Sequence, residues 1–381
     1  MSFLNDELTS EKRGLLIFVE PTPYILDLMR VIRGQVSYPI EVLFAAENVS
    51  QSWDLDSEGA PISVLPAAPL RAVLEINSKL ASGRYRFAHV AGWGHKVLLA
   101  SILLAWRHRV PTFVESDTPL RPDLPCWKKI VKRAVYPWLF RIPQKVFPSG
   151  SRQAKYFNHY GVPPEKIVVV KMTVDVASIM KWSLSPAARE ARHSVRAQWG
   201  MAPDEMVFIF VGRLEPQKGL KMLIKVFDDI CACGTGARLI IAGDGSLRSF
   251  VELQAAAIPQ LRYLGRLKPG GVLSAYNAAD VAVLPSLFEP WGLVVNEAMA
   301  AGLPVIASSA VGCTDDLVRD GETGSIFPAY SAEALRTCMR FFVDHPQERK
   351  KMGCAARALI SGWTLEKEAE ILMRNWECAL Q

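Results

Sequence analysis

Two positively charged side chains stand five residues apart, directly after a buried apolar stretch of the sequence. The stretch ends at Val211, Gly212 opens a turn, and Arg213 and Lys218 precede a helical pattern that starts at Leu220. Ligands of open parallel sheets bind at the carboxyl ends of strands, and an arginine fork with a lysine point charge suits a diphosphate. The segment predicts a phosphate-binding turn; the alternative is a solvated turn with two surface cations.

Two carboxylates flank the start of another helical pattern. A second apolar stretch ends at Leu284, Glu289 follows in a loop, and Glu297 lies one to two turns into a helix expected to start near Leu293. The N-terminus of such a helix is a ready site for phosphate oxygens, and Gly292 would let backbone approach a ligand closely. Glu297 could accept hydrogen bonds from both hydroxyls of a ribose, and Glu289 from those of a sugar. Alternatively, Glu289 caps the helix and Glu297 is a solvated residue on its face.

The elements that would position these residues recur along the whole chain. Short, nearly all-apolar runs of the kind that strands buried on both faces require lie at 15–19, 41–44, 87–90, 112–115, 145–148, 206–211, 238–242, 262–264, 281–284 and 305–307. Helical patterns between them include 220–231, 271–278, 296–301 and 332–343. Strand–helix alternation predicts an α/β protein of two layered domains.

The predicted division assigns residues 1–172 to an N-terminal domain and 173–362 to a C-terminal domain. The remaining residues, 363–381, hold a helical pattern with no strand after it. We expect this terminal helix to return to the N-terminal domain.

Composition excludes several classes of protein. Half of the 381 residues are hydrophobic and 22% are charged, so the chain is not disordered. The longest apolar run, 97–106, is about half the length that crosses a bilayer, and the polar, charged N-terminus is not a signal peptide. Seven scattered cysteines predict reduced thiols in a cytoplasmic protein. A net charge of +6 does not indicate a nucleic-acid-binding tail.

The second half resembles the nucleotide-binding domain of GT-B glycosyltransferases, specifically the retaining enzymes of family 4. The resemblance covers about residues 207–327 and is carried, in the family's order, by 212–219, 242–245, 263–265 with 273–279, the Glu289–Glu297 pair, 301–305 and 320–324. It implies two Rossmann-like domains facing a cleft. The N-terminal domain would bind the acceptor and the C-terminal domain the nucleotide sugar.

The resemblance also implies roles for individual residues. Arg213 and Lys218, beside Gly212, would neutralise the donor diphosphate. Glu297 would hold the ribose, and Glu289 would hold hydroxyls of the transferred sugar. The remaining donor-binding residues that it implies are Gly292, Leu293 and Val294, whose backbone would contact phosphate and sugar, and Arg266 and Leu267, which would meet the base.

The implied mechanism needs neither a metal nor a cofactor. Departure of a nucleoside diphosphate builds negative charge, and two fixed cations with a helix dipole are aimed where that charge develops. The only Asp-x-Asp, Asp54 and Asp56, is expected in a loop and not as a metal ligand. The sugar would pass through an oxocarbenium-like state, and retention would require attack on the same face.

The first half departs from the family. The glycine-rich loop that often follows the first strand is replaced by 20–24, which contains no glycine. The histidine expected at the end of a central strand is replaced by Ala91, and His95 lies a few residues on, where it could contact the donor sugar and take part in catalysis. His89, inside the strand, is expected to be a satisfied core residue. Asp117 follows the next strand and is a candidate acceptor-side ligand.

A basic region precedes the domain boundary. Residues 106–172 hold thirteen Lys and Arg against four Asp and Glu, a larger excess than that of the whole chain. Within it, residues 127–140 form an amphipathic pattern, with Ile130, Ala134 and Trp138 on one face. The basic face is formed by Lys128, Lys129, Lys132 and Arg133. The pattern suits an anionic membrane surface or, alternatively, a core-facing helix with a solvated basic side. Nucleic-acid binding is disfavoured because no recognition motif is present.

Together these observations predict a retaining, metal-independent glycosyltransferase. It would transfer a sugar from a UDP- or GDP-sugar to a saccharide or lipid-linked saccharide in glycan biosynthesis, and could attach peripherally to the inner face of the cytoplasmic membrane. The alternatives are a nucleotide-sugar epimerase or hydrolase of the same fold, and a non-catalytic nucleotide-sugar-binding protein. The sequence does not distinguish the donor base, the sugar, the acceptor or the linkage.

Overall fold

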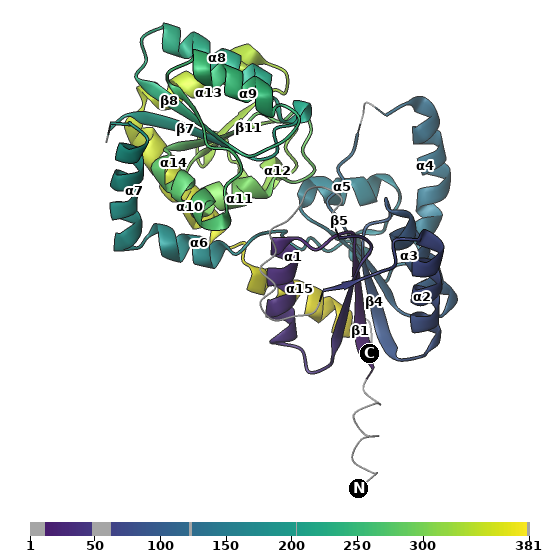
Figure 1. Ribbon diagram of the computed structural model, residues 1–381. Coiled ribbons are helices and arrows are strands. Elements are labelled where there is room, and N and C mark those ends of the chain that lie inside the picture. Colours follow the sequence, from purple (N-terminus) through teal and green to yellow (C-terminus); the bar gives the residue numbers. More distant parts are fainter. Residues whose placement is uncertain (1–11, 48–61, 122–123, 203, 379–381) are drawn as a thin grey trace. The chain divides into compact units, whose positions relative to one another are not determined.

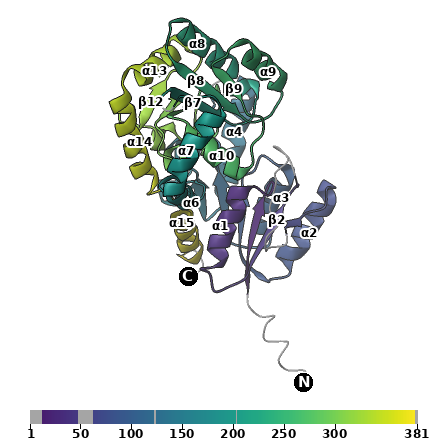
Figure 2. The same ribbon diagram turned by 60° about the vertical axis from the view of Figure 1, so that its left-hand side comes forward.

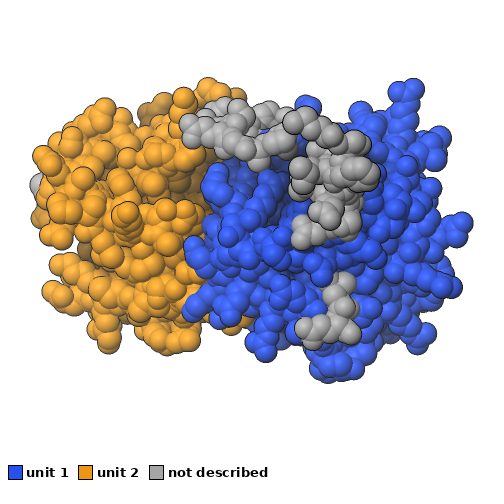
Figure 3. All heavy atoms as spheres, turned by 90° about the horizontal axis from the view of Figure 1, so that it is seen from below, with its two compact units in different colours: residues 1–172, 365–381 blue, residues 173–364 orange. Residues whose placement is uncertain are grey.

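The computed structural model describes residues 12–47, 62–121, 124–202 and 204–378. It divides the chain into two units, residues 1–172 with 365–381 and residues 173–364, which are coloured separately in Figure 3. Each unit contains one six-stranded parallel sheet with helices (Figure 1). The predicted α/β class with two Rossmann-like domains is therefore confirmed.

The sheet of unit 1 has the strand order β3-β2-β1-β4-β5-β6. Its strands are β1 (Arg13–Phe18), β2 (Ile40–Phe44), β3 (Ser63–Val64), β4 (Tyr85–Ala91), β5 (Thr112–Ser116) and β6 (Lys145–Pro148). The central strand β1 pairs in parallel with both β2 and β4. The strand order reverses between β1 and β4, so the carboxyl ends of these two strands form the switch point where ligands of such sheets bind.

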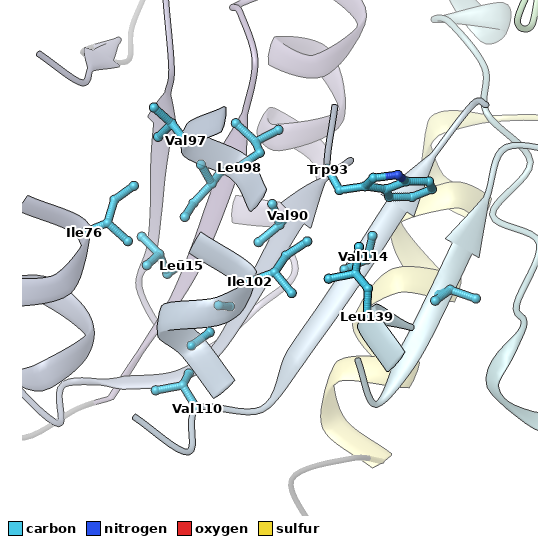
Figure 4. Packing of buried hydrophobic residues seen from close by; sticks show 14 of the residues in the cluster. Leu15, Ile76, Val90, Trp93, Val97, Leu98, Ile102, Val110, Val114 and Leu139 are labelled. Atoms are coloured by element: carbon cyan, nitrogen blue, oxygen red, sulfur yellow. The ribbon is translucent and has the colours of Figure 1, made fainter. Parts of the chain in front are cut away.

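Alternate residues of β1 pack into two different cores, because successive side chains of a strand point to opposite faces. Leu15 and Ile17 belong to one cluster, with side chains from α2 (Pro69–Ala81), α3 (Lys96–Arg107) and α5 (Ser151–His159) (Figure 4). Leu16 and Phe18 belong to the other, with α1 (Pro23–Arg33) and α15 (Leu365–Cys378). Helices α1 and α15 lie side by side (Figures 1 and 2). The C-terminal helix thus completes the core of unit 1.

The sheet of unit 2 repeats this plan with the order β12-β11-β10-β7-β8-β9. Its strands are β7 (Met206–Val211), β8 (Ala237–Ala242), β9 (Leu261–Tyr263), β10 (Val281–Leu284), β11 (Val305–Ser308) and β12 (Gly324–Phe327). The order reverses between β7 and β10, which pair at Phe208 with Val281. The two loops that follow these strands are those in which the sequence places the candidate charged residues.

The helices of unit 2 connect and cover these strands. They are α6 (Val176–Ser183), α7 (Pro186–Gln198), α8 (Leu220–Ala232), α9 (Arg248–Ala257), α10 (Pro269–Ala278), α11 (Leu293–Ala300), α12 (Thr314–Leu317), α13 (Ala332–Asp344) and α14 (Pro346–Ile360), with the short 3-10 helix η3 (Pro216–Lys218) before α8. Helix α8 buries Leu220, Leu223, Ile224, Phe227 and Ile230, the spacing of a single apolar face. The apolar pattern thus explains why the helix packs on the sheet.

The ten apolar runs identified in the sequence all correspond to strands of the two sheets. The sequence did not indicate β3 and β12, each of which is one of the two edge strands of its sheet. The helix expected over 127–140 is α4 (Cys126–Leu139). Two apolar residues of its supposed core face, Ile130 and Trp138, are exposed. The alternative of a core-facing helix is therefore wrong.

Candidate functional site

The loop after β7 is tied to the loop after β10. The backbone N–H of Leu287 donates to the carbonyl of Gln217 over 2.7 Å. Gly219 has a φ of 72°, and a Cβ at this position would lie 2.0 Å from the carbonyl oxygen of Pro285. Only glycine fits this conformation and this approach. The two segments that the sequence predicted as ligand-binding are therefore held together at the switch point of the sheet.

A third loop, after β8, supports the one after β7. The N–H of Gly212 donates to the carbonyl of Ala242 over 3.0 Å, and the N–H of Leu214 donates to the backbone carbonyl of Asp244 over 2.9 Å. The carboxylate of Glu215 accepts a hydrogen bond of 2.7 Å from the hydroxyl of Ser246. These contacts fix the backbone on both sides of Arg213, whose own side chain is exposed.

Lys218 and Glu289 form an ion pair, with Nζ donating to Oε2. Their side chains are only 12% and 13% exposed, so both charges are largely removed from water and each requires the other. The buried hydroxyl of Ser286 also donates to Glu289 Oε2, over 3.4 Å. The alternative that Glu289 caps the following helix is wrong, because Gly292 occupies the N-cap position and the Glu289 side chain is paired with Lys218.

The start of α11 is placed by a buried polar chain. Trp291 Nε1 donates to Asn296 Oδ1 over 3.2 Å, Asn296 Nδ2 donates to Thr173 Oγ1 over 3.2 Å, and that hydroxyl donates to the carbonyl of Trp363 over 2.9 Å. Gly292, with a φ of 103°, makes the turn into the helix. Leu293 and Val294 form its first turn. The helix N-terminus therefore lies beside the Glu289 loop in a fixed orientation.

Glu297 lies on the second turn of α11 and is not a solvated residue. Its Oε2 accepts a hydrogen bond of 2.9 Å from the hydroxyl of Tyr276, on α10. Burial raises the pKa of Glu297 to about 7, although the hydrogen bond from Tyr276 acts to lower it. Burial, with the charge of Glu297, also raises the pKa of Tyr276 far above its ordinary value, so this hydroxyl is a permanent donor.

The residues predicted to meet the base follow β9. Arg266 is exposed and Leu267 is partly buried. The preceding residue, Gly265, accepts a hydrogen bond of 2.8 Å at its carbonyl from the N–H of Gly243. This contact connects the turn before Arg266 to the loop after β8.

The two candidate residues of unit 1, His95 and Asp117, lie near the switch point of their own sheet. His95 is the N-cap residue of α3, and its Nδ1 is a buried nitrogen without a hydrogen-bond partner in the described part of the chain. Asp117 directly follows β5. Burial and then the charge of Asp117 raise the pKa of Tyr24, at the start of α1. Asp117 therefore lies close to the residues that replace the expected glycine-rich loop.

His89 is a satisfied core residue, as the sequence indicated. Its Nδ1 accepts a hydrogen bond of 3.3 Å from Trp376 Nε1, which leaves the ring hydrogen on Nε2. That nitrogen donates over 3.0 Å to Glu115 Oε2. The ring is stacked on Phe147. Both nitrogens are thus occupied: Nδ1 helps to hold α15 to the sheet, and Nε2 joins β4 to β5.

Sequence reasoning missed Tyr276 and Ser286, which contact the two candidate carboxylates. Ser286 could have been noticed because it comes two residues after the end of β10, in the predicted binding loop. Tyr276 lies 21 positions before Glu297 on a different helix, and no spacing rule connects them.

Asp54 and Asp56 lie outside the described residues. Within the described ranges, no group of three or more His, Cys, Asp or Glu side chains is arranged to hold a metal ion. Among the helices that could be searched, none is both long enough and apolar enough to cross a bilayer.

Comparison with known proteins finds a glycosyltransferase family match in each half of the chain. Residues 21–173 match the family described as "Glycosyl transferase 4-like domain", and residues 191–359 match "Glycosyl transferases group 1". The chain is 26% identical over 387 residues to the sulfoquinovosyl transferase SQD2 of Arabidopsis thaliana, and this match covers 93% of the chain and 71% of that protein. It is 29% identical over 231 residues to the D-inositol 3-phosphate glycosyltransferase of Rhodococcus opacus, covering 58% of the chain and half (50%) of that protein.

Solved structures share the fold over nearly the whole chain. The HepE protein of Anabaena, crystallised with UDP, superposes with a TM-score of 0.77 at 20% identity, covering 96% of this chain and 98% of HepE. The sucrose-phosphate synthase of Thermosynechococcus elongatus gives a TM-score of 0.72 at 18% identity, covering 97% of this chain and 99% of the synthase. The two family matches, one in each half of the chain, and this two-domain architecture together support a glycosyltransferase of the GT-B fold.

Proposed function

We propose that the protein transfers a sugar from a nucleotide-sugar donor to a saccharide or lipid-linked saccharide, with retention of anomeric configuration and without a metal ion. The observation that carries the proposal is the arrangement at the switch point of unit 2. There, the loop that carries Lys218 is hydrogen-bonded to the loop that carries Glu289, and the second loop leads into α11, which holds the partly buried Glu297 carboxylate on its second turn. The arrangement offers cationic groups to a diphosphate and carboxylates to hydroxyls.

Carboxylates would hold the hydroxyls of the donor, and positively charged groups would hold its diphosphate. The ribose hydroxyls would donate to Glu297, and the diphosphate would receive hydrogen bonds from the N-terminus of α11 and from Lys218 and Arg213. Glu289 would then accept hydrogen bonds from the sugar. Arg266 and Leu267 would lie against the base.

Catalysis would follow from charge that accumulates as the sugar leaves. The glycosidic bond to the diphosphate breaks, electrons pass to the phosphate oxygens, and Lys218, Arg213 and the α11 dipole stabilise them. The positively charged sugar would be attacked by the acceptor hydroxyl on the face from which the diphosphate departs, and the proton of that hydroxyl would pass to a phosphate oxygen of the departing diphosphate. His95 would contact the donor sugar, which would use its otherwise unpaired Nδ1, and Asp117 would contact the acceptor.

The donor base is the first property to test. The structures similar in fold include HepE with UDP and HepE with UDP-glucose, which makes UDP-sugars the first ligands to try, followed by GDP-sugars. A ligand that binds only the folded protein raises the melting temperature by mass action, so thermal shifts across a panel of nucleotide sugars identify the donor.

Single substitutions then test the site. Lys218→Ala and Glu289→Ala should each lower turnover by about 10²-fold or more, the usual effect of removing a group that stabilises developing charge. Lys351→Ala and Glu333→Ala, whose side chains are each 77% exposed, are matched controls and should retain wild-type turnover. Near-normal turnover of either site variant would overturn the proposal.

Incubation of the enzyme with donor alone separates the alternative activities. An epimerised sugar would indicate a nucleotide-sugar epimerase, and complete acceptor-independent hydrolysis would indicate a hydrolase. Calorimetric binding of UDP or GDP with no turnover on any acceptor would instead indicate a non-catalytic binding protein.

A further inference from the structure

Helix α4 exposes most of its apolar side chains. Leu139, at its last position, is the helix's only buried residue. Five large apolar side chains are exposed: Trp127, Ile130, Val131, Val135 and Trp138. Ile130, which the sequence placed on a possible core face, is 67% exposed. An apolar face of this size on a described helix requires an explanation.

The apolar face of α4 lies on a different side of the helix from the residues that pack against unit 1. Lys132, Tyr136 and Leu139 pack against the rest of the unit and share one side of the helix at spacings of four and three. At about 100° per residue, Ile130, Val131, Val135 and Trp138 centre about 120° around the helix from that side. The sequence grouped Lys132 with the outer basic face, but the structure places it against the rings of Tyr136 and Tyr156.

The apolar face extends beyond α4. The ring of Trp106, at the end of α3, lies 6.1 Å from that of Trp138 in an edge-to-face arrangement, and it too is exposed. We call these six side chains, Trp106, Trp127, Ile130, Val131, Val135 and Trp138, the α4 surface. They make up half of the twelve large apolar side chains found exposed in the described residues.

Positive charge borders the α4 surface on both sides. Lys128 lies on one flank of the stripe, and Lys129 and Arg133 lie on the other. The ammonium of Lys128 is 5.3 Å from the ring of Trp127. The pKa of Lys132 is lowered, first by burial and then by the positive charges of Arg121 and Lys128. The local potential is thus positive enough to disfavour a further cation, and it would attract anions.

We infer that the α4 surface docks on an anionic lipid bilayer, with the apolar stripe at the level of the acyl chains and the flanking cations on the lipid phosphates. An amphipathic helix with tryptophans at its ends and basic flanks has the composition of an interfacial membrane anchor. The benefit of such docking, access to a lipid-linked acceptor, rests on the proposed function. The docking itself does not, because it can be measured without turnover.

A second copy of the chain fits this surface less well than a bilayer does. A two-fold interface would place the α4 surface against itself, so Lys128, Lys129 and Arg133 of each copy would face the same cations of the other. Like charges brought together in this way oppose association. Anionic headgroups, in contrast, neutralise both flanks while the acyl chains cover the stripe.

Co-sedimentation with vesicles tests the inference. The full chain should bind vesicles of phosphatidylglycerol and phosphatidylcholine at least about tenfold more tightly than pure phosphatidylcholine. Binding should weaken as NaCl rises from about 0.1 M to about 0.5 M, because salt screens the headgroup attraction. The fluorescence of the exposed tryptophans should shift to shorter wavelength on binding.

Two variants separate the apolar and electrostatic contributions. Ile130→Glu with Trp138→Ala should abolish the fluorescence shift, and Lys128→Glu with Arg133→Glu should reduce binding to anionic vesicles at least about tenfold. The controls are Leu253→Ser, at an exposed leucine of α9, and Lys350→Glu with Lys351→Glu on α14. These should bind vesicles as the wild type does.

The melting temperature and the thermal shift by nucleotide sugar should remain those of the wild type in all four variants, which shows that the donor site is intact. Equal affinity for charged and uncharged vesicles, or no binding to either, would overturn the inference. So would a concentration-dependent dimer that Ile130→Glu dissociates. If the wild-type chain binds vesicles as expected but transfers no sugar, that result would count against the proposed function alone.

Discussion

The burial of Glu297 predicts that donor binding depends on pH near neutrality. An ionised carboxylate can accept hydrogen bonds at both of its oxygens, whereas a protonated one carries a hydrogen on one of them. The pKa of Glu297 is raised by burial to about 7. The carboxylate is therefore about half protonated at pH 7 in the empty site, and binding of a ribose through its hydroxyls should release a proton.

The size of the effect follows from this pKa. The difference between about 7 and the ordinary value of 4.5 corresponds to about 3 kcal/mol, so burial is the main cost and the 2.9 Å bond from Tyr276 offsets part of it. If only the ionised form binds, apparent donor affinity falls about tenfold between pH 8 and pH 6. Tyr276→Phe removes a hydrogen bond to a charged group, which should raise the pKa of Glu297 further, by about one pH unit. At pH 7 this weakens binding about fivefold.

Calorimetric titration with a nucleotide sugar measures this directly. A nucleotide sugar is preferable to UDP, because a terminal phosphate has a second pKa of about 6 and would release protons of its own. Titrations in buffers of different ionisation enthalpy give the number of protons released. The wild type should release about half a proton per donor at pH 7, and Tyr276→Phe more.

A matched control exists in unit 1. Tyr85 also donates its hydroxyl to a carboxylate, Glu41, over 2.6 Å, so Tyr85→Phe removes the same kind of bond away from the donor site and should leave the pH profile unchanged. The reasoning is refuted if wild-type affinity is constant between pH 6 and pH 8. It is also refuted if Tyr276→Phe and wild type have superimposable profiles.

Three further predictions concern stability. Gly219→Ala places a Cβ 2.0 Å from a backbone carbonyl oxygen at a φ of 72° and should lower the free energy of unfolding in urea by about 2 kcal/mol or more, whereas Gly236→Ala, with open space around it, should not. Trp376→Ala removes a fully buried ring stacked 4.9 Å from a phenylalanine and should cost about 3–5 kcal/mol; Trp127→Ala, at an exposed ring, should cost almost nothing. Glu297→Gln should melt higher than wild type at pH 8 but not at pH 5. A carboxyl with a raised pKa stabilises the fold at low pH and loses that contribution as pH rises through about 7.

Most strands of both sheets, though not β3 and β12, were predictable because their physical requirement is simple. A strand covered on both faces must be apolar throughout, and runs such as Met206–Val211 and Val281–Leu284 satisfy that requirement with identical bounds in sequence and structure. The edge strand β12 reads Gly-Ser-Ile-Phe. It has one neighbour in the sheet and is only partly buried, so a polar residue is tolerated and the apolar signal is lost.

The outward direction of α4 could not be predicted from its pattern. A period of 3.6 residues indicates that one face of the helix is apolar. The same period occurs in a helix that packs its apolar face on a core and in one that exposes that face to bind something else. The decisive feature is the side formed by Lys132, Tyr136 and Leu139. Here two amphipathic side chains supply the contacts that apolar residues would otherwise make, and hydrophobicity alone does not identify them.

The candidate residues of unit 2 could be proposed from the sequence because they lie in or just beyond loops that follow strand ends. The contacts that they make in the empty site could not be predicted in this way. Lys218 and Glu289 are 71 positions apart and form one ion pair. A buried charge that has lost its partner is strongly unfavourable, so the empty site holds its lysine and its carboxylate against each other.

When a donor enters, the diphosphate would replace Glu289 as the counter-ion of Lys218, and the sugar hydroxyls would replace Lys218 as the donors to Glu289. A nucleoside diphosphate without its sugar satisfies only the first exchange and leaves the carboxylate without its partner. The pair therefore gives a physical reason for the site to prefer the complete donor to the product that remains after transfer.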